Sequence, residues 1–320
     1  MTTGSGTPHL IRPTAKATPT SARILDALAV QIDNVLDAHH TFGASTRWTE
    51  LTESPAAEER RLMRRQYGPG ERGRLDWTDE PVTYAAGTAS TFTAVAAQHL
   101  EAIAKLVRAR EVMFSIPPLA RAVLEIAGHL HWMLCPFQSE EWTIRDRAAR
   151  VFLIQIADKQ RAQTAAKSLG HPGVSKLVER YKHHRNVELR RRFWPSEIGY
   201  SDAGDLHLRD LQHRMPGLSE SVTWIEKVHK VDWQIGGAYA LLSNASHPTF
   251  THVQELMQDN GASVHFGLED ATFPYRLVRM SVFTFLETWK LTAAYLGHGQ
   301  RQMVDLMNDF DTDVELVSVR

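Results

Sequence analysis

Residues 232–250 read DWQIGGAYALLSNASHPTF, an apolar stretch in which polar side chains recur at a fixed spacing. Tyr239, Ser243 and His247 follow one another every four residues, so on a helix they lie along one face. Pro248 disfavours helical geometry at the residue before it, which places the imidazole of His247 at the helix end. The pattern predicts a buried helix that carries a row of polar groups into an apolar setting.

A second apolar segment, residues 119–134, carries Arg121, Glu125 and His129 at the same spacing. Buried charges are costly unless they are paired, so we expect Arg121 and Glu125 to bond each other or the arginines of the next helix. A role for this pair in binding a substrate stays open. Two core helices with polar stripes indicate either a site or a structural network. The arginines of the next helix are Arg145, Arg147 and Arg150.

Most of the remaining chain shows helical periodicity, with proline and glycine at the expected segment ends. No stretch shows the sustained two-residue alternation of a strand, and no internal repeat is found. The sequence therefore predicts an all-α fold, a multi-helix bundle with an N-terminal helical extension and long irregular loops. Besides the 232–250 stretch, helices are expected at residues 21–40, 55–66, 92–113, 119–134, 143–169, 173–192, 219–230, 249–257 and 273–296.

Composition and periodicity divide the chain into four parts. Residues 1–20 are rich in Thr, Pro and Gly and lack the apolar run of a signal peptide, so we expect a disordered tail. Residues 21–90 hold N-terminal helices and a long connection that loses its periodicity after residue 66. Residues 91–300 are expected to form the core of the bundle, and residues 301–320 an acidic C-terminal tail.

The overall composition is that of a globular protein, with 43% hydrophobic and 23% charged residues. The formal net charge is −1, so any nucleic-acid binding must come from a local patch. The single cysteine, Cys135, excludes an intramolecular disulfide and lies in an apolar run, where we expect a buried thiol. No long segment is apolar enough for a membrane span, so we expect a cytoplasmic protein without a membrane partner.

The most basic part of the chain is residues 176–192, KLVERYKHHRNVELRRR, with seven Lys or Arg residues against two Glu. A helix of this kind either tracks a phosphate backbone or is a solvated face. The aromatic residues that single-strand binding favours are limited here to Tyr181, Phe193 and Trp194. The candidate nucleic-acid contacts are Lys176, Arg180, Lys182, Arg185, Arg190, Arg191 and Arg192.

The sequence motifs of most familiar enzyme classes are missing from this chain. Phosphate-binding glycine loops, GxSxG elbows and GxGxxG fingerprints are not found. There is also no HExxH motif and no pair of ExxH motifs, which are the usual helical metal-binding patterns. We therefore expect no metal site and no cofactor.

Two segments resemble a group of bacterial helical proteins, many of them actinobacterial. They are SIPPLARAVLEIAGHLHWML, with an Arg-x3-Glu pattern, and AYALLSNASHP, with Tyr-x3-Ser-x3-His. That group is in turn similar to the HEPN superfamily of helical bundles, which includes RNA-cleaving toxins and defence proteins. The resemblance covers roughly residues 92–296 and implies a helical bundle in a stress or phage-defence setting.

The resemblance implies the fold more directly than it implies an activity. Active HEPN ribonucleases use an arginine followed by a histidine after four to six residues. In this chain Ala240, Leu241 and Leu242 stand where the arginine before His247 belongs. Metal-free RNA cleavage by the mechanism of that family is therefore not expected.

Three functions remain open on the sequence. The favoured one is a non-catalytic bundle that binds RNA, a small polar ligand or a second copy of the chain. The second is a divergent hydrolase or nuclease, in which His247 moves a proton and Arg121 stabilises a developing anion. The third is a nucleic-acid-binding protein that uses residues 176–192. The catalytic residues of the second hypothesis are His247, Ser243, Tyr239, Arg121 and Glu125.

Overall fold

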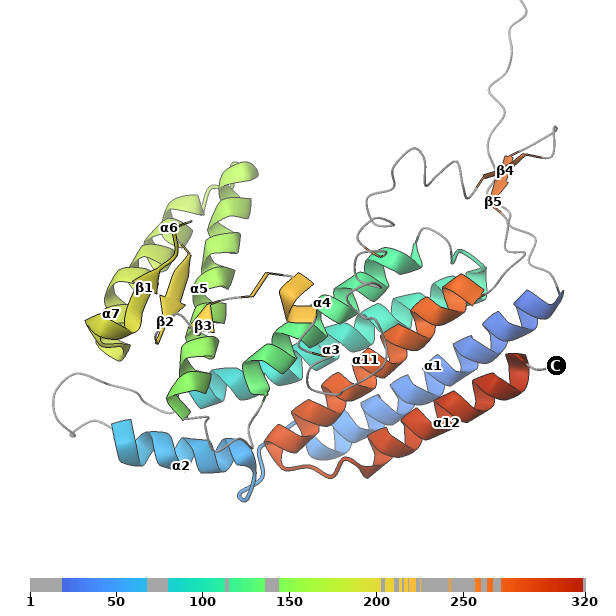
Figure 1. Ribbon diagram of the computed structural model, residues 1–320, viewed down its shortest axis with the longest axis horizontal. Coiled ribbons are helices and arrows are strands. Elements are labelled where there is room, and N and C mark those ends of the chain that lie inside the picture. The colour runs from blue at the N-terminus through green and yellow to red at the C-terminus, as the bar shows by residue number, and fades with distance from the viewer. Residues whose placement is uncertain are drawn as a thin grey trace, which may run out of the picture.

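Most of the chain between residues 19 and 318 is described by a computed structural model (Figure 1). Apart from Leu242, the predicted helix at residues 232–250 lies outside the described residues. The same is true of most of the predicted helix at 249–257. Residues 1–18, 68–79, 113–114, 136–143, 203–204, 210–212, 215, 218, 223–224, 226–241, 243–256, 260–263, 267–271 and 319–320 are not described.

The main body of the described chain is a bundle of long helices that lie side by side (Figure 1). The all-α fold expected from the sequence is confirmed, with helices placed by the periodic apolar residues that the sequence shows. The helices of the bundle are α1 (Pro19–Thr46), α3 (Glu80–Ala109), α4 (Ile116–Leu134), α11 (Thr272–Leu296) and α12 (Arg301–Ser318).

An apolar core runs through this bundle and includes its first helix. Leu25, Leu28 and Ile32 of α1 are fully buried at helical spacing, and they belong to the same cluster as Phe285 and Trp289 of α11. Burying a side chain of this size contributes about 1.5–3 kcal/mol to folding. The N-terminal helix is therefore part of the core and not an extension that precedes it.

Helix α3 begins at Glu80, well before the expected start at residue 92. Pro81 lies in its first turn, where a missing N–H costs nothing. The early turns bury small residues, including Ala85 and Ala89, which weaken the hydrophobic signal although alanine favours helix. Residues 80–90, which were expected to belong to the long connection, are therefore helical.

The C-terminal segment is also more ordered than expected. Residues 301–320 were predicted to be an acidic tail, whereas α12 spans Arg301–Ser318 and packs against α1 and α11. Met303 and Phe310 are buried in the bundle core, and Leu306 packs against it at the intervening helical position. The apolar stripe, and not the acidic residues between its members, decides the structure here.

Helix α2 (Pro55–Tyr67) lies at one end of the bundle (Figure 1). Its residues are those predicted from the sequence, with one more at the C-terminal end. The Ala57 backbone N–H donates to the Ser54 hydroxyl over 3.0 Å, which caps the helix ahead of Pro55. Among the helices that the structure describes, none is long and apolar enough to cross a membrane.

A second structural unit, which we call the arm, stands away from this end of the bundle (Figure 1). Its helices α5 (Ile144–Ser168) and α6 (Val174–His183) lie side by side, and α6 continues through a π-helical turn, His184–Glu188, into α7 (Leu189–Arg192). The predicted helices at 143–169 and 173–192 are confirmed.

A second buried cluster joins the arm to the bundle. It includes Met63 of α2, Ala85 of α3, Leu134 of α4 and Phe152 of α5. Leu189 of α7 and Tyr295 of α11 also belong to it, so six helices contribute and the base of the arm is packed against the bundle.

The segment after α7, expected to be irregular, forms a small antiparallel sheet with the order β1–β2–β3. Gly199 pairs with His207, and His207 pairs in turn with Arg214. Strands of two or three residues are too short to produce a periodic signal. The strands are β1 (Ile198–Tyr200), β2 (Leu206–Leu208) and β3 (His213–Arg214).

A two-stranded antiparallel pair lies beyond the bundle end opposite the arm (Figure 1). It consists of β4 (Met257–Asp259) and β5 (Val264–Phe266). Met257 was expected at the end of a helix and lies in a strand instead. Residues 260–263, between the two strands, are outside the description, but the strands pair with each other.

Candidate functional site

Tyr239, Ser243 and His247 all lie outside the described residues. The hypothesis that they act together with Arg121 and Glu125 therefore stays a hypothesis.

Arg121 and Glu125 pair with each other on α4, as expected. The distance from Arg121 Nε to Glu125 Oε1 is 2.8 Å, and both side chains are partly exposed. His129, one turn further, bonds the Glu125 backbone carbonyl through Nδ1 over 2.8 Å, and burial lowers the pKa of its imidazole. Arg121, Glu125 and His129 are thus linked to one another along α4.

Of the three arginines near the start of α5, two bond the end of α4, while the third, Arg145, pairs with Glu197 at 2.6 Å. Arg147 donates to the Leu134 carbonyl over 2.5 Å, while Arg150 donates to the carbonyls of Trp132 (2.5 Å) and Cys135 (3.0 Å). The last carbonyls of a helix have no partner within it, and positive charge is favourable at that end. These buried guanidinium groups therefore cap α4.

Cys135 is buried beside these arginines, as the sequence predicts. Burial raises the pKa of its thiol to about 11, although Arg147 and Arg150 act in the opposite direction. The thiol is therefore protonated at neutral pH and is a poor nucleophile. Within the described ranges, no group of three or more His, Cys, Asp or Glu side chains is arranged to hold a metal ion.

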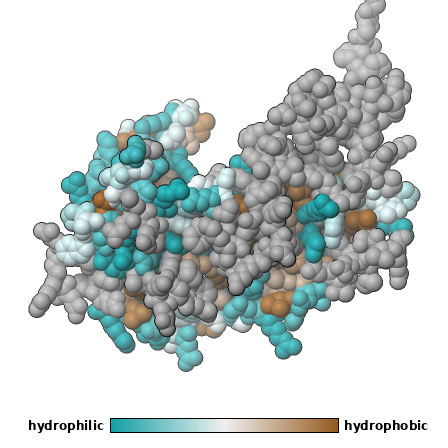
Figure 2. Space-filling view, viewed as in Figure 1, coloured by the Kyte–Doolittle hydropathy of each residue, from teal (hydrophilic) through white to brown (hydrophobic). Residues whose placement is uncertain are grey.

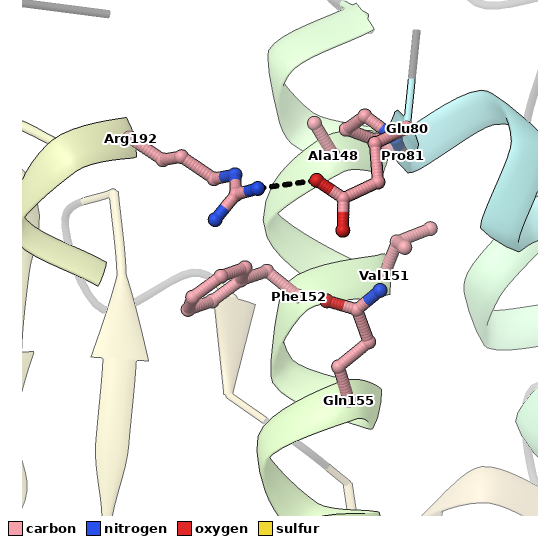
Figure 3. Close-up of a pocket in the computed structure, with 7 residues that line it drawn as sticks. All are labelled: Glu80, Pro81, Ala148, Val151, Phe152, Gln155 and Arg192. Carbon is pink, nitrogen blue, oxygen red and sulfur yellow. Dashed lines mark hydrogen bonds and ion pairs between the residues drawn. The ribbon is translucent and has the colours of Figure 1, made fainter. Parts of the chain in front are cut away.

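The seven cations predicted as nucleic-acid contacts fall into separate groups, and the first of these is a single buried residue. The Arg192 side chain is 7% exposed and pairs with Glu188 and Glu80. Figure 3 shows it reaching from α7 towards Glu80 of α3, across the face of α5 that carries Phe152 and Gln155. The cavity there measures about 10 Å³, room for one water at most. Arg192 holds α7 against α3 and α5, which corrects its predicted role.

Lys176 and Arg180 form the second group, on α6. Both are exposed, but they continue at four-residue spacing to His184, which is buried against α5. The His184 ring stacks on Phe152 at 4.5 Å and bonds the Gln155 side chain over 3.1 Å. Lys176 and Arg180 therefore lie on the same side of α6 as His184, the side that packs against α5.

Arg185, Arg190 and Arg191 form the third group and line a surface pocket of about 560 Å³. Lys182 is exposed and lies one turn before Arg185. No carboxylate is among the described residues that line this pocket. The lining residues are Arg185, Asn186, Leu189, Arg190, Arg191, Phe193, Trp194, Pro195, Ile198 and Tyr200.

Aromatic and apolar side chains complete the pocket. Leu189 and Phe193 are buried, whereas Trp194 is 37% exposed and Tyr200 is 48% exposed. The Arg185 guanidinium lies 5.5 Å from the centre of the Tyr200 ring, within cation–π range. Hydrophilic side chains dominate the surface of the arm, with isolated apolar ones between them (Figure 2).

The π-helical turn His184–Glu188 contributes to this arrangement. A π turn closes its hydrogen bond over five residues and adds one residue to the usual turn. Arg185 and Arg190, five residues apart, consequently line the same pocket, while His184 points into α5. Such turns are frequent at functional sites.

Comparison with known proteins returned no match to any family model, curated protein or solved structure.

Several pocket residues were not found by sequence reasoning. Asn186, Ile198 and Tyr200 line the pocket, yet none was singled out. A signal existed in part, because Trp194 and Tyr200 follow directly on the basic helix. The segment that carries Tyr200 was interpreted as irregular, so its aromatic ring was not placed beside the arginines.

Proposed function

We propose that this protein binds nucleic acid through the arm, with phosphate groups contacting Arg185, Arg190 and Arg191. The observation that supports this most strongly is the pocket, which combines three guanidinium groups with exposed aromatic rings and no described carboxylate. Guanidinium groups match phosphate oxygens in charge and geometry. Aromatic rings offer surfaces on which bases stack. A nucleotide chain presents both kinds of group.

The charge distribution supports the same proposal. Residues 176–192 carry a local excess of five positive charges, from seven Lys or Arg and two Glu. Since the formal net charge of the whole chain is −1, the remaining residues together carry −6. A polyanion is attracted to the arm and repelled on average by the rest of the surface.

Binding is preferred over catalysis because of the geometry of the described residues. Arg121 and Glu125 pair with each other, and the thiol of Cys135 is buried and protonated. No observation on the described part of the chain favours the divergent nuclease. We propose further that the nucleic acid is RNA and that the protein acts in the cytoplasm. The resemblance to HEPN proteins, some of which act on RNA, is compatible with this proposal.

The test is a titration of a labelled single-stranded oligonucleotide at several salt concentrations, followed by fluorescence anisotropy. The logarithm of the association constant should fall with that of the salt concentration, with a slope of about −0.7 for each phosphate neutralised. For three arginines the slope is about −2. The variant Arg190→Glu/Arg191→Glu should weaken binding by roughly tenfold or more and flatten this slope.

The matched control is Lys176→Glu/Arg180→Glu, which makes the same change in net charge on the α5 side of α6. This variant should lose much less affinity than the pocket variant. Wild-type protein that fails to bind any oligonucleotide at low salt, or equal losses in the two variants, would contradict the proposal.

A further inference from the structure

We infer that the arm pocket takes one unpaired nucleotide of a single strand, with its base against Trp194 and Tyr200. Its phosphate lies at Arg190 and Arg191. This inference rests on the proposed function and adds the strandedness of the ligand, which positive charge alone does not determine.

The size of the pocket is the first reason. A volume of about 560 Å³ falls within the range of sites that enclose a small molecule or part of one. A base within a duplex is stacked and paired, so it enters such a pocket only after it has been extruded. An unpaired base needs no such step and can be stacked on an aromatic side chain at once.

The second reason is that the backbone beside the Trp194 ring is held in place. The Trp194 backbone N–H donates to Glu197 Oε2 over 2.9 Å, and Glu197 pairs in turn with Arg145 at 2.6 Å. Arg209 lies 3.7 Å from the same carboxylate. A wall anchored in this way loses little freedom when a ligand binds, which favours affinity.

The Tyr200 ring is also carried by an ordered element. Tyr200 ends β1 and pairs with Leu206 of β2, so its backbone is part of the small sheet. Arg185 lies over this ring, and its planar guanidinium group provides a further surface on which a base can stack. The pocket thus presents stacking surfaces from the helix and from the sheet.

All three arginines are within reach of the phosphates of the strand, and Arg185 also offers the face of its guanidinium group to the base. Arg185 is partly buried and is engaged with the Tyr200 ring and the Tyr181 hydroxyl, the latter at 3.3 Å. Arg190 and Arg191 are exposed at the same pocket, where phosphate oxygens remain in water. Stacking accepts every base, so we expect binding that tolerates changes of sequence.

The experiment compares three labelled probes of equal length with the wild-type chain: a single strand, its duplex, and an abasic strand that retains the phosphates. The single strand should bind roughly tenfold or more tighter than either of the others. Trp194→Ala should weaken single-strand binding about 5- to 150-fold, the equivalent of about 1–3 kcal/mol for one stacked base. The same substitution should leave the affinity for the abasic strand and the salt slope unchanged.

Trp194→Phe keeps a stacking surface and should recover most of the affinity, which separates stacking from a structural role. Equal binding of the three probes by the wild type would overturn the inference and leave the proposed function standing. Competition by polyglutamate as strong as competition by the single strand would also overturn it. If the wild type bound none of the probes, the proposed function itself would be contradicted.

Discussion

Arginine has opposite roles where the arm meets the bundle and at the pocket of the arm. At the base of the arm, Arg147 and Arg150 of α5 are 3% and 4% exposed, and they donate to the last carbonyls of α4 in the bundle. At the far end of the basic segment, Arg190 and Arg191 are exposed and line a pocket. A buried guanidinium group must donate its N–H groups to the protein, whereas an exposed one can donate them to a ligand. Burial, and not residue type, therefore separates an arginine that caps a helix from one that lies at the surface of a pocket.

The largest effect should come from removing a buried arginine where α5 meets α4. Arg147→Ala leaves Glu59, which lies 2.6 Å from the guanidinium, and the end of α4 without this partner. We expect the free energy of unfolding to fall by roughly 3–5 kcal/mol, measured by urea denaturation. The control Arg108→Ala removes an exposed ion pair with Asp33 and should cost about 0–1 kcal/mol. A loss below that of the control would show that the buried arginine does not stabilise α4.

A second effect tests how tightly the bundle is packed. A Cβ at Gly128 of α4 would lie 2.6 Å from the backbone of Ser221, so Gly128→Ala forces the two segments apart. We expect a loss of about 1–3 kcal/mol in the free energy of unfolding.

Gly87→Ala is the matched control for this substitution. Gly87 lies within α3, and a Cβ added there would meet no other segment within 4 Å. This change should stabilise the protein by about 0.4–1 kcal/mol. If Gly128→Ala raised the free energy of unfolding as Gly87→Ala does, the close approach at Gly128 would be contradicted.

The third effect compares a buried histidine in each region. Burial lowers the pKa of His39 in the bundle to about 4, with a smaller contribution from His40. Burial, and then the charge of Lys159, lowers the pKa of His184 in the arm to about 4. Between pH 4 and pH 6.5 the unfolded chain therefore binds more protons than the folded chain. The stability is full above pH 6.5 and is lost as the pH falls through this window.

His39 lies among aromatic rings, with the Trp289 ring centre 5.2 Å away, so phenylalanine suits its place. His39→Phe should therefore reduce the pH dependence of the free energy of unfolding, obtained from urea denaturation, by about 3 kcal/mol between pH 7 and pH 4. The wild type and this variant are compared at the same series of pH values. Parallel curves for the two proteins would show that His39 does not titrate in this window.

The smallest effect on stability should be found at the pocket. Arg190→Ala/Arg191→Ala removes exposed side chains, so the free energy of unfolding should change by no more than about 0.5 kcal/mol. Affinity for a single-stranded oligonucleotide should fall in the same variant. A large loss of stability would show that these arginines stabilise the fold, as Arg147 does.

Much of the fold could be predicted from local patterns. The observed bounds of α2, α4 and α5 lie within three residues of those expected, because prolines, caps and apolar spacing mark these helices in the sequence. The first turns of α3 were missed because they bury alanines. The short strands β1–β3 were missed because two or three residues carry no periodicity.

The candidate site could be predicted only in part. The basic segment 176–192 was identified, but Arg190 and Arg192 look equivalent in the sequence and have opposite surroundings in the structure. Their exposure depends on which face of α7 packs against α5, and a π turn shifts that face. Tyr200 reaches the pocket through a strand pairing that no local pattern announces.

The sequence by itself determined that the chain is helical, that its positive charge is concentrated in one segment, and that its cysteine is buried. These properties depend on neighbours along the chain, through periodicity and composition. The tertiary structure decided which arginines cap a helix, which one joins α7 to α3, and which line a pocket with aromatic rings. Those roles depend on packing against residues distant in sequence, which decides whether a charged group is enclosed by the protein or exposed at its surface.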